Sequence, residues 1–302
     1  MGALNRYRSI TIKAPAKINL YLKVRNKRKD GYHNLCSLMQ MVGLYDHLTF
    51  QEAPTGIRLY IENSPLSSGQ DNLVVQAAET LQKELQRSQK GRRKGVKITL
   101  IKNIPVSAGM GGGSSDAAAT LLGLNRLWSL HWSRKKLAKI GEGLGSDLPF
   151  FFHGPTAWVT ERGEEVEKVN AVFNGWAVLV NPGMSVSTAE VFEDFSKTFV
   201  LTNKKSNISI KKLNIQKPAI EEVFLRPYND LEKITLQKLP VLLAIKKRLK
   251  TLGGTGVLMS GSGPTLFGLF PEYAAAKKAA GVMKEQSSLQ VWVTKVLKRV
   301  PF

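Results

Sequence analysis

The sequence predicts an α+β protein that folds into two domains. At 302 residues the chain exceeds the usual size of a single domain. Stretches in which polar and apolar residues alternate, as they do in strands, are interspersed with stretches of helical periodicity. A new series of strands opens at WAVLVNPG (176–183), which favours a boundary near residue 165. We therefore expect one domain over residues 1–165 and a second over residues 166–302.

The first half contains strands that are predicted from alternation with period two. They are SITIKAPAKINLYLKV (9–24), taken as two strands around a proline turn, HLTFQE (47–52), GIRLYIEN (56–63), VKITLIKNIP (96–105) and the hairpin GPTAWVTERGEEVEKV (154–169), which turns at Arg162 and Gly163. Helices are predicted over NLVVQAAETLQKELQRSQ (72–89), over the alanine-rich run after Gly113 and over SRKKLAKIGEGLG (133–145). In the first of these helices the apolar residues recur three and four apart, and Asp71 is placed to cap its start.

The second half continues the mixture of helices and strands. Its predicted elements are a strand at 176–183, the helix LPVLLAIKKRL (239–249), a glycine-rich turn in LMSGSGPTLFGLF (258–270) flanked by strands, the helix EYAAAKKAAGVMKEQ (272–286) and a strand over QVWVTKVL (290–297). A polar, lysine-rich insertion lies at about 202–218.

The composition indicates a globular protein of the cytoplasm. Hydrophobic residues make up 43% of the chain and charged residues 22%, values that argue against a fibrous or disordered protein. No apolar run approaches the roughly 18–20 residues that a membrane-spanning helix needs, and the N-terminal stretch lacks the apolar segment of a signal peptide. The single cysteine, Cys36, excludes an internal disulfide and a thiolate metal site, so we expect a small buried side chain.

The formal charge of +21 raises the question of a nucleic-acid partner. Short basic runs are spread along the whole chain, and no basic strand studded with aromatic residues accompanies them. This distribution favours a generally basic surface over a dedicated nucleic-acid-binding face. Such a surface would also attract an anionic substrate.

Glycines crowd the stretch NIPVSAGMGGGSSDAAATLLGLNRLW (103–128) directly before a predicted helix. Glycine allows positive φ and close approach to the backbone, and the first N–H groups of a helix lack intrahelical partners. Together they form a cradle for an anion. The hydroxyls of Ser114 and Ser115 can cap the helix or face a phosphate or a metal ion. The alternative is an ordinary glycine-rich turn before a helix.

The spacing excludes two common phosphate loops. A Walker A loop requires Gly-Lys-Ser/Thr, whereas Ser114 directly follows Gly113. A dinucleotide fingerprint requires a third glycine three positions after the second, and counting from Gly109 and Gly111 that position is Ser114.

Two further segments carry polar residues that matter in combination. APAKINLYLKV contains Lys17 and Asn19, and EGLGSDLPFFFHG contains Asp147. Taken alone, Lys17 is a solvated strand lysine and Asp147 an ordinary turn aspartate. However, PVSAGMGGGSSDAA resembles the phosphate-binding motif of the galactose, homoserine, mevalonate and phosphomevalonate (GHMP) kinase superfamily, and LMSGSGPTLFGLF resembles its C-terminal glycine motif.

The resemblance narrows to one family within this superfamily, the 4-diphosphocytidyl-2-C-methyl-D-erythritol kinases. Its motifs occur in family order from residue 13 to residue 270, as APAKINLYLKV, RKDGYHNLCSLMQMV, DNLVVQA, GLGSDLPFFFHG, NPGMSVSTAEVF and YNDLE. The basic loop 90–94 and the lysine-rich stretch 202–218 depart from the pattern and resemble local elaborations of the surface.

The resemblance implies a GHMP-kinase-like fold with the active site in the cleft between the two domains. It implies ATP-dependent phosphorylation of the 2-hydroxyl of 4-diphosphocytidyl-2-C-methyl-D-erythritol, a step of the non-mevalonate pathway to isopentenyl diphosphate. Asp147 would accept the proton of the hydroxyl, and Lys17 would favour the ionised form of Asp147 and polarise the hydroxyl. Mg²⁺ is expected with the nucleotide, but its protein ligands are unknown, since no acidic pair marks a cage and the four histidines lack zinc spacing.

The resemblance also implies the binding residues. Nucleotide-binding residues are expected at Pro105, Val106, Ser107, Ala108, Gly109, Met110, Gly111, Gly112, Gly113, Ser114, Ser115 and Asn72. Tyr32 and His33 would hold the cytosine ring with Phe192 on the opposite face, and Asn19 would contact the substrate near Lys17. Alone, these aromatic residues would be core packing and Asn72 a helix cap. The turn at Ser260–Gly263 would bring backbone donors to the substrate diphosphate or close the site, unless it is a plain hairpin turn.

Three alternatives stay open at this point. A sister kinase acting on mevalonate, homoserine or a sugar would keep the glycine loop without the DGYH aromatic pair. A nonenzymatic nucleic-acid-binding protein would account for the charge more directly, and a catalytically inactive nucleotide sensor would lack Lys17 or Asp147. For the kinase we expect a small-molecule substrate, no membrane or nucleic-acid partner, and a monomer or weak homodimer.

Overall fold

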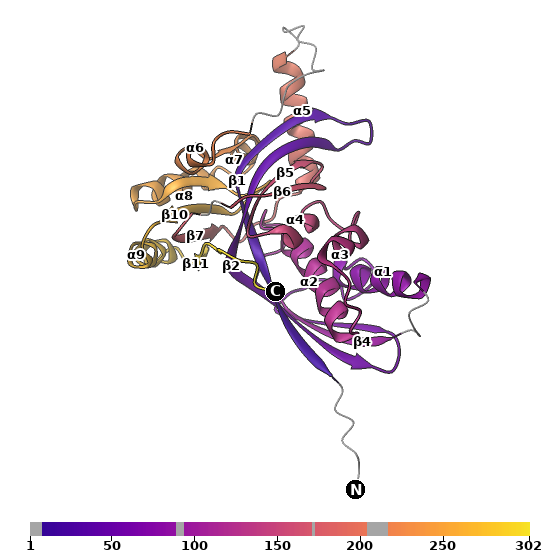
Figure 1. Cartoon of the computed structure of the whole chain (residues 1–302). Helices are drawn as coiled ribbons and strands as arrows, with labels where there is room; N and C mark the ends of the chain where they lie inside the picture. Colours follow the sequence, from indigo (N-terminus) through magenta and orange to yellow (C-terminus); the bar gives the residue numbers. More distant parts are fainter. Residues whose placement is uncertain (1–7, 89–93, 171–172, 204–216) are drawn as a thin grey trace.

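The computed structural model describes residues 8–88, 94–170, 173–203 and 217–302. In this part of the chain the strands form two sheets with helices packed on them, which confirms the α+β class (Figure 1). The first sheet contains β1 (Ser9–Lys27), β2 (His33–Ala53), β3 (Ile57–Glu62), β4 (Gly95–Ile101), β5 (Thr156–Glu161), β6 (Glu165–Lys168) and β8 (Tyr228–Asn229). The second contains β7 (Trp176–Asn181), β9 (Thr255–Met259), β10 (Leu266–Phe270) and β11 (Gln290–Lys295).

The long strands β1 and β2 pair antiparallel and extend through most of the molecule in Figure 1. β1 continues through Pro15 as one strand, so the predicted division of residues 9–24 into two strands is wrong. The register with β2 shifts between Pro15 and Ala16, and a bulge is a place where a sheet tolerates a residue without an N–H donor. β2 includes the predicted short strand 47–52 together with Cys36, which is fully buried as expected.

Helices of the first half pack on the first sheet and on one another. They are α1 (Leu73–Arg87), α2 (Gly112–Leu127), α3 (Arg134–Ile140) and α4 (Leu148–His153). The first three confirm the predicted helices, whereas the short apolar helix α4 was not predicted. The β5–β6 hairpin is also where the alternation predicts it.

The helix starts differ from the predicted caps. Asn72, not Asp71, caps α1, because its Oδ1 accepts a hydrogen bond from the Val74 amide at 2.9 Å. Asp71 instead accepts a hydrogen bond from the Ser67 hydroxyl at 2.7 Å. Gly111 is the N-cap of α2 and no side chain caps this helix, so the expected serine cap is also wrong. The first amides of α2 are therefore left for another partner.

The second half supplies helices that the sequence indicated only in part. They are α5 (Thr188–Asn203), α6 (Ile220–Leu225), α7 (Glu232–Lys238), α8 (Val241–Thr251) and α9 (Tyr273–Lys284). The predictions for α8 and α9 are confirmed, and both helices pack on the second sheet. α5, α6 and α7 were not predicted. Most of the lysine-rich stretch 202–218 and of the basic loop 90–94 lies outside the described residues.

The two sheets meet along β1 and β2. β8 comes from the second half but pairs in parallel with β1, and Val42 of β2 forms a bridge to Val296. A shared hydrophobic core joins Ile18 of β1 to Leu179 and Phe267 of the second sheet. The chain passes from the first sheet to the second between Lys168 and Trp176, a little beyond the predicted boundary at residue 165. Within the described residues, no helix is both long and apolar enough to cross a membrane.

Candidate active site

A cavity of about 1100 Å³ opens where β1, the glycine loop, α5 and the β9–β10 turn come together. The predicted site residues that line it are Lys17, Asn19, Tyr32, His33, Asn72, Pro105, Val106, Ser107, Ala108, Gly109, Met110, Gly111, Gly112, Gly113, Ser114, Asp147 and Phe192. Ser115 is not among the lining residues. Its side chain is fully buried and its hydroxyl has no hydrogen-bond partner in the described part of the chain, so the structure does not place it against a bound nucleotide.

Lys17 and Asp147 face each other in this cavity. The Lys17 ammonium lies 3.1 Å from Asp147 Oδ2, with side-chain exposures of 4% and 25%. β1 holds the Lys17 backbone, whose amide donates to the Met110 carbonyl at 3.0 Å. Asp147 stands at the N-cap position of α4, but its carboxylate does not cap the helix and is free to turn to the lysine. The structure thus brings together an acid and an amine from distant segments.

Asn19 orients the lysine. Its Oδ1 accepts a hydrogen bond from the Lys17 ammonium at 2.7 Å, and its Nδ2 donates to the Ser37 hydroxyl at 2.8 Å. Both ends of the amide are therefore engaged within the protein. The expected contact of Asn19 with substrate stays a prediction, while its contact with Lys17 is present in the structure.

The β9–β10 turn is attached to the glycine loop. The Ser260 hydroxyl donates to the Gly109 carbonyl at 2.9 Å and accepts a hydrogen bond from the backbone N–H of Asn19 at 3.3 Å. Gly261 and Ser262, which follow it, line the cavity. The predicted turn at Ser260–Gly263 thus reaches the site, and the buried Ser260 links the second sheet to the loop.

Two glycines of the loop adopt backbone conformations that other residues rarely take. Gly109 and Gly111 have φ of +75° and +67°. A Cβ on Gly109 would lie 2.0 Å from the Ser260 carbonyl oxygen, and a Cβ on Gly111 would lie 3.0 Å from Lys17 Cε. Glycine is required here because the loop packs against the turn on one side and the lysine on the other. The first residues of α2, Gly112 to Ser114, line the cavity together with Lys17 and Asp147.

The aromatic end of the cavity differs in detail from the expected cytosine slot. The His33 and Phe192 rings stack on each other at 5.4 Å with an interplanar angle of 25°. Tyr32 is 57% exposed and faces the guanidinium of Arg162, 5.5 Å from its ring centroid. The expected residues are brought together, but in this structure His33 and Phe192 leave no gap for a ring between them. Arg162, which the sequence analysis noted only as a turn residue, lines the same cavity.

The surroundings of His33 favour its neutral form. Its Nε2 lies 2.7 Å from the Ser196 hydroxyl of α5. Burial, with a smaller contribution from the Lys27 ammonium, lowers the pKa of His33 below its ordinary value of 6.5. A neutral imidazole carries one donor and one acceptor, which suits recognition of the edge of a base.

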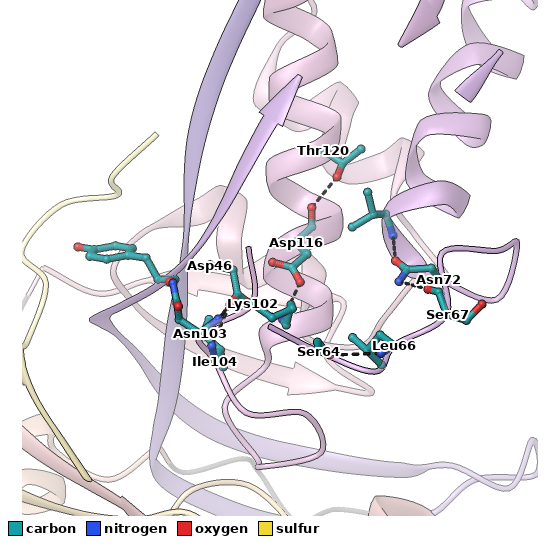
Figure 2. A network of polar contacts seen from close by, with 12 residues as sticks. Asp46, Ser64, Leu66, Ser67, Asn72, Lys102, Asn103, Ile104, Asp116 and Thr120 are labelled. Atoms are coloured by element: carbon teal, nitrogen blue, oxygen red, sulfur yellow. Dashed lines mark hydrogen bonds and ion pairs between the residues drawn. The ribbon is translucent and has the colours of Figure 1, made fainter. Parts of the chain in front are cut away.

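A buried ion cluster that the sequence analysis missed lies beside the other end of the cavity (Figure 2). The Lys102 ammonium, at the end of β4, forms an ion pair with Asp46 Oδ2 and another, at 2.8 Å, with Asp116 Oδ2 on α2. Although burial alone would lower it, the carboxylates of Asp116 and Asp46 raise the pKa of Lys102. Burial, together with repulsion from Asp46, raises the pKa of Asp116 well above its usual value. In the sequence, this cluster was indicated only by an aspartate inside the alanine-rich run SSDAAA.

Asn72 lies near this cluster in Figure 2, with its side chain engaged in the protein. Besides capping α1, its Nδ2 donates to the Ser67 carbonyl at 2.8 Å. It lines the cavity, so a nucleotide contact stays a prediction. Across the described ranges no group of three or more histidine, cysteine, aspartate or glutamate side chains could hold a metal ion.

Comparison with known proteins identifies the family. Residues 72–155 match the family model of the GHMP kinases N terminal domain, and residues 217–288 match that of the GHMP kinases C terminal domain. A protein of Syntrophus aciditrophicus named 4-diphosphocytidyl-2-C-methyl-D-erythritol kinase is 43% identical to this chain, over 94% of this chain and 98% of its own length. This chain belongs to the 4-diphosphocytidyl-2-C-methyl-D-erythritol kinase family. The member from Geobacter sulfurreducens is 39% identical, over 93% of this chain and 96% of its own.

Solved structures agree with membership of the 4-diphosphocytidyl-2-C-methyl-D-erythritol kinase family. A crystal structure of a 4-(cytidine 5'-diphospho)-2C-methyl-D-erythritol kinase, 30% identical, matches with a TM-score of 0.73 over 95% of this chain and 99% of its own. Homoserine kinase from Cytophaga hutchinsonii, 18% identical, shares the fold with a TM-score of 0.70 over 100% of this chain and 98% of its own. The resemblance inferred from the motifs is confirmed, and the chain is a kinase.

Proposed function

We propose that this kinase transfers the γ-phosphoryl group of ATP to the 2-hydroxyl of 4-diphosphocytidyl-2-C-methyl-D-erythritol in the non-mevalonate pathway. The observation that carries the proposal is the Lys17–Asp147 pair, 3.1 Å apart, in the cavity that the glycine loop lines. Relatives named for this substrate match nearly the whole chain. Phosphoryl transfer requires aligned oxygens, neutralised charge and an acceptor for the hydroxyl proton, and the cavity offers a group for each.

The two side chains have complementary roles in this proposal. Asp147 accepts the proton of the 2-hydroxyl as its oxygen attacks the γ-phosphorus. Lys17, held by Asn19, pairs with the Asp147 carboxylate and stabilises charge on the attacking oxygen. The amides at the start of α2 hold the phosphates of the nucleotide. Each group sits on a strand or helix end, so its position is set before the substrates arrive.

Mg²⁺ enters the proposal with ATP. When bound, it neutralises the charge of the transferring phosphates. Magnesium prefers oxygen ligands and keeps several waters, so it needs few ligands from the protein. The Ser114 hydroxyl and the Asp147 carboxylate line the cavity beside the loop and are oxygen donors of this kind. We therefore propose Ser114 as the protein's contact to the magnesium of the nucleotide.

The aromatic end of the cavity is proposed as the cytosine site. Tyr32, His33 and Phe192 line it, and the partly exposed Tyr32 offers a flat face to a base. For the ring to enter between His33 and Phe192, these two side chains must separate. We propose that the substrate replaces their mutual stacking with stacking on the base.

The test is an assay with the purified protein, ATP, magnesium and 4-diphosphocytidyl-2-C-methyl-D-erythritol. Phosphorus NMR should show a new monophosphate ester on the 2-oxygen. Mevalonate, homoserine and galactose in parallel reactions should give no product. Phosphorylation of one of these alone would assign the chain to another substrate. Sedimentation of the same preparation tests the proposed monomer or weak homodimer.

A further inference from the structure

The segment between β4 and α2, residues 102–111, carries the backbone that lines the nucleotide side of the cavity. Its first residues form hydrogen bonds with one carboxylate of β2. Asp46 Oδ1 accepts hydrogen bonds from the amides of Asn103 at 2.6 Å and Ile104 at 2.8 Å. The Asn103 side chain adds a bond to the Tyr45 carbonyl at 2.8 Å. The start of the loop therefore has its position fixed by Asp46.

The far end of the loop is linked to Asp46 through the ammonium group of Lys102. Lys102 pairs with the second oxygen of Asp46 and reaches Asp116 Oδ2 on the second turn of α2 at 2.8 Å. Figure 2 shows Lys102 between the two carboxylates. Because Asp46 holds the entrance of the loop and Asp116 belongs to the helix at its exit, one three-residue cluster connects both ends.

The cluster adjoins the site where phosphates would bind. Lys102 and Asp116 both line the cavity, and the Lys102 ammonium is 3.3 Å from the point that a Cβ on Gly112, the first residue of α2, would occupy. The Lys102 ammonium therefore lies beside the first residue of α2. The amides of the first turn of α2 are those proposed to hold the nucleotide.

The cluster is costly as a purely structural feature. Two carboxylates share one ammonium in a site where Asp116 is only 3% exposed, and Asp116 Oδ1 has no hydrogen-bond partner within the described residues. Buried ion clusters of this kind often contribute less stability than apolar residues of the same volume. In some proteins such clusters specify one geometry.

We propose that Asp46 and Asp116 are positioning residues for ATP, which hold the two ends of the glycine loop in the binding geometry by sharing Lys102. The inference rests on the proposed function only in placing ATP at the glycine loop. Loss of the link at Asp116 should loosen the helix end of the loop, so that the amides no longer converge on the phosphates. The alcohol substrate, bound at the aromatic end, should be unaffected.

The test compares three variants at α2 by calorimetric titration with ATP and magnesium and by steady-state kinetics. Asp116→Ala removes the link, and the dissociation constant of ATP should rise at least about tenfold, the scale of one charge-assisted hydrogen bond. Asp116→Asn keeps an acceptor for Lys102 and should restore most of the affinity. Thr120→Val is the matched control: it removes the bond from Thr120 to the Asp116 carbonyl on the same helix and leaves the cluster intact. Its affinity for ATP should equal that of the wild type.

The kinetic result separates positioning from simple destabilisation. The KM for ATP should rise in Asp116→Ala while the KM for the alcohol stays within about twofold, measured well below the melting temperature of the variant. An unchanged ATP dissociation constant in folded Asp116→Ala, or equal losses in Thr120→Val, would overturn the proposal. If Asp116→Ala does not fold, Asp46→Asn tests the other end of the loop, and the dissociation constant of ATP should again rise. ATP titration needs no alcohol substrate, so a wrong proposed substrate would leave this result intact.

Discussion

Lys17 Nζ lies 3.1 Å from Asp147 Oδ2, and both side chains have space because Gly111 beside them has no side chain. A Cβ at Gly111 would lie 3.0 Å from Lys17 Cε and 3.3 Å from Asp147 Oδ2. β1, the glycine loop and the start of α4 thus converge on one small volume. The ion pair keeps this geometry only while all three segments stay in place.

Asp147→Asn should lower kcat by about 10²- to 10⁴-fold, the usual scale of general acid–base catalysis. The amide cannot take up the hydroxyl proton, yet it keeps the shape of the carboxylate. The dissociation constant of ATP should stay within a few-fold of the wild type, because the loop amides are unchanged. Steady-state kinetics and calorimetry check both expectations. Glu142→Gln, an exposed carboxylate in the nearby connection between α3 and α4, is the control and should keep full activity. Near-normal turnover of Asp147→Asn would remove Asp147 as the base.

Gly111→Ala should lower kcat at least about tenfold and should also weaken the binding of ATP. Its methyl group would press on Lys17 and Asp147, and even a small displacement of catalytic groups is costly. The structure thus places the added methyl group against the Lys17–Asp147 pair. Gly143→Ala is the matched control, since Gly143 also has positive φ, +91°, but has nothing within 4 Å of the added Cβ. Both variants should lose about 1 kcal/mol of stability from backbone strain. Equal kinetic losses would show that strain, and not the contact, is responsible.

The sequence was sufficient to predict that residues of several contiguous motifs line one cavity. Lys17, Asp147 and the glycines lie in short segments with strong local constraints, and the loop conformation follows from Gly109 and Gly111 at positive φ. Helices with clear periodicity, such as α1 and α9, were predictable for the same reason. The short helix α4 was missed because six residues, LPFFFH, are too few to show a helical period.

Features that depend on distant partners could not be predicted in this way. Lys102 follows an apolar strand and has the sequence signature of a solvated strand end, because nothing nearby in the sequence indicates Asp46 or Asp116. The stacking of His33 on Phe192 depends on where α5 is placed by the tertiary structure. Ser115 was misplaced because its motif contains two adjacent serines, and helical geometry turns neighbouring side chains about 100° apart. One of the two faces the cavity and the other the core.

His33 should make the stability of the kinase depend on pH below 6.5. The pKa of His33 in the folded state is lowered by burial and by Lys27. As the pH falls, the unfolded chain therefore binds a proton at His33 before the folded chain does. The stability associated with neutral His33 is therefore fully present above 6.5 and is lost as pH falls through the lowered folded pKa. Urea unfolding at a series of pH values should show this loss in the wild type and a flatter profile in His33→Gln. Lys27→Met should raise the pKa of His33, measured by NMR titration of its ring resonances. A His33 pKa above 6.5 would contradict the assignment.

Asp116→Asn should stabilise the kinase, and the gain should grow as pH rises from acid to neutral. Asp46 accepts hydrogen bonds from two amides and pairs with the ammonium. Asp116 pairs with the ammonium through one oxygen, and its other, buried oxygen has no partner among the residues that the structure describes, so burial raises the pKa of Asp116. The folded protein then retains a proton that the unfolded chain releases above 3.8, and wild-type stability falls with rising pH until the raised folded pKa is passed.

Asparagine at this position has no proton to lose and still accepts a bond from Lys102. At pH 7 the variant should gain about 1 kcal/mol or more in the free energy of unfolding, the scale on which replacement of buried charge becomes favourable. At pH 4 the difference should be smaller, because there the wild-type carboxyl is neutral in the folded state. Urea unfolding of both proteins at pH 4, 5.5 and 7 provides the measurement. A variant that is less stable at pH 7 than at pH 4, relative to the wild type, would mean that Lys102 stabilises the ionised Asp116 carboxylate by more than burial destabilises it.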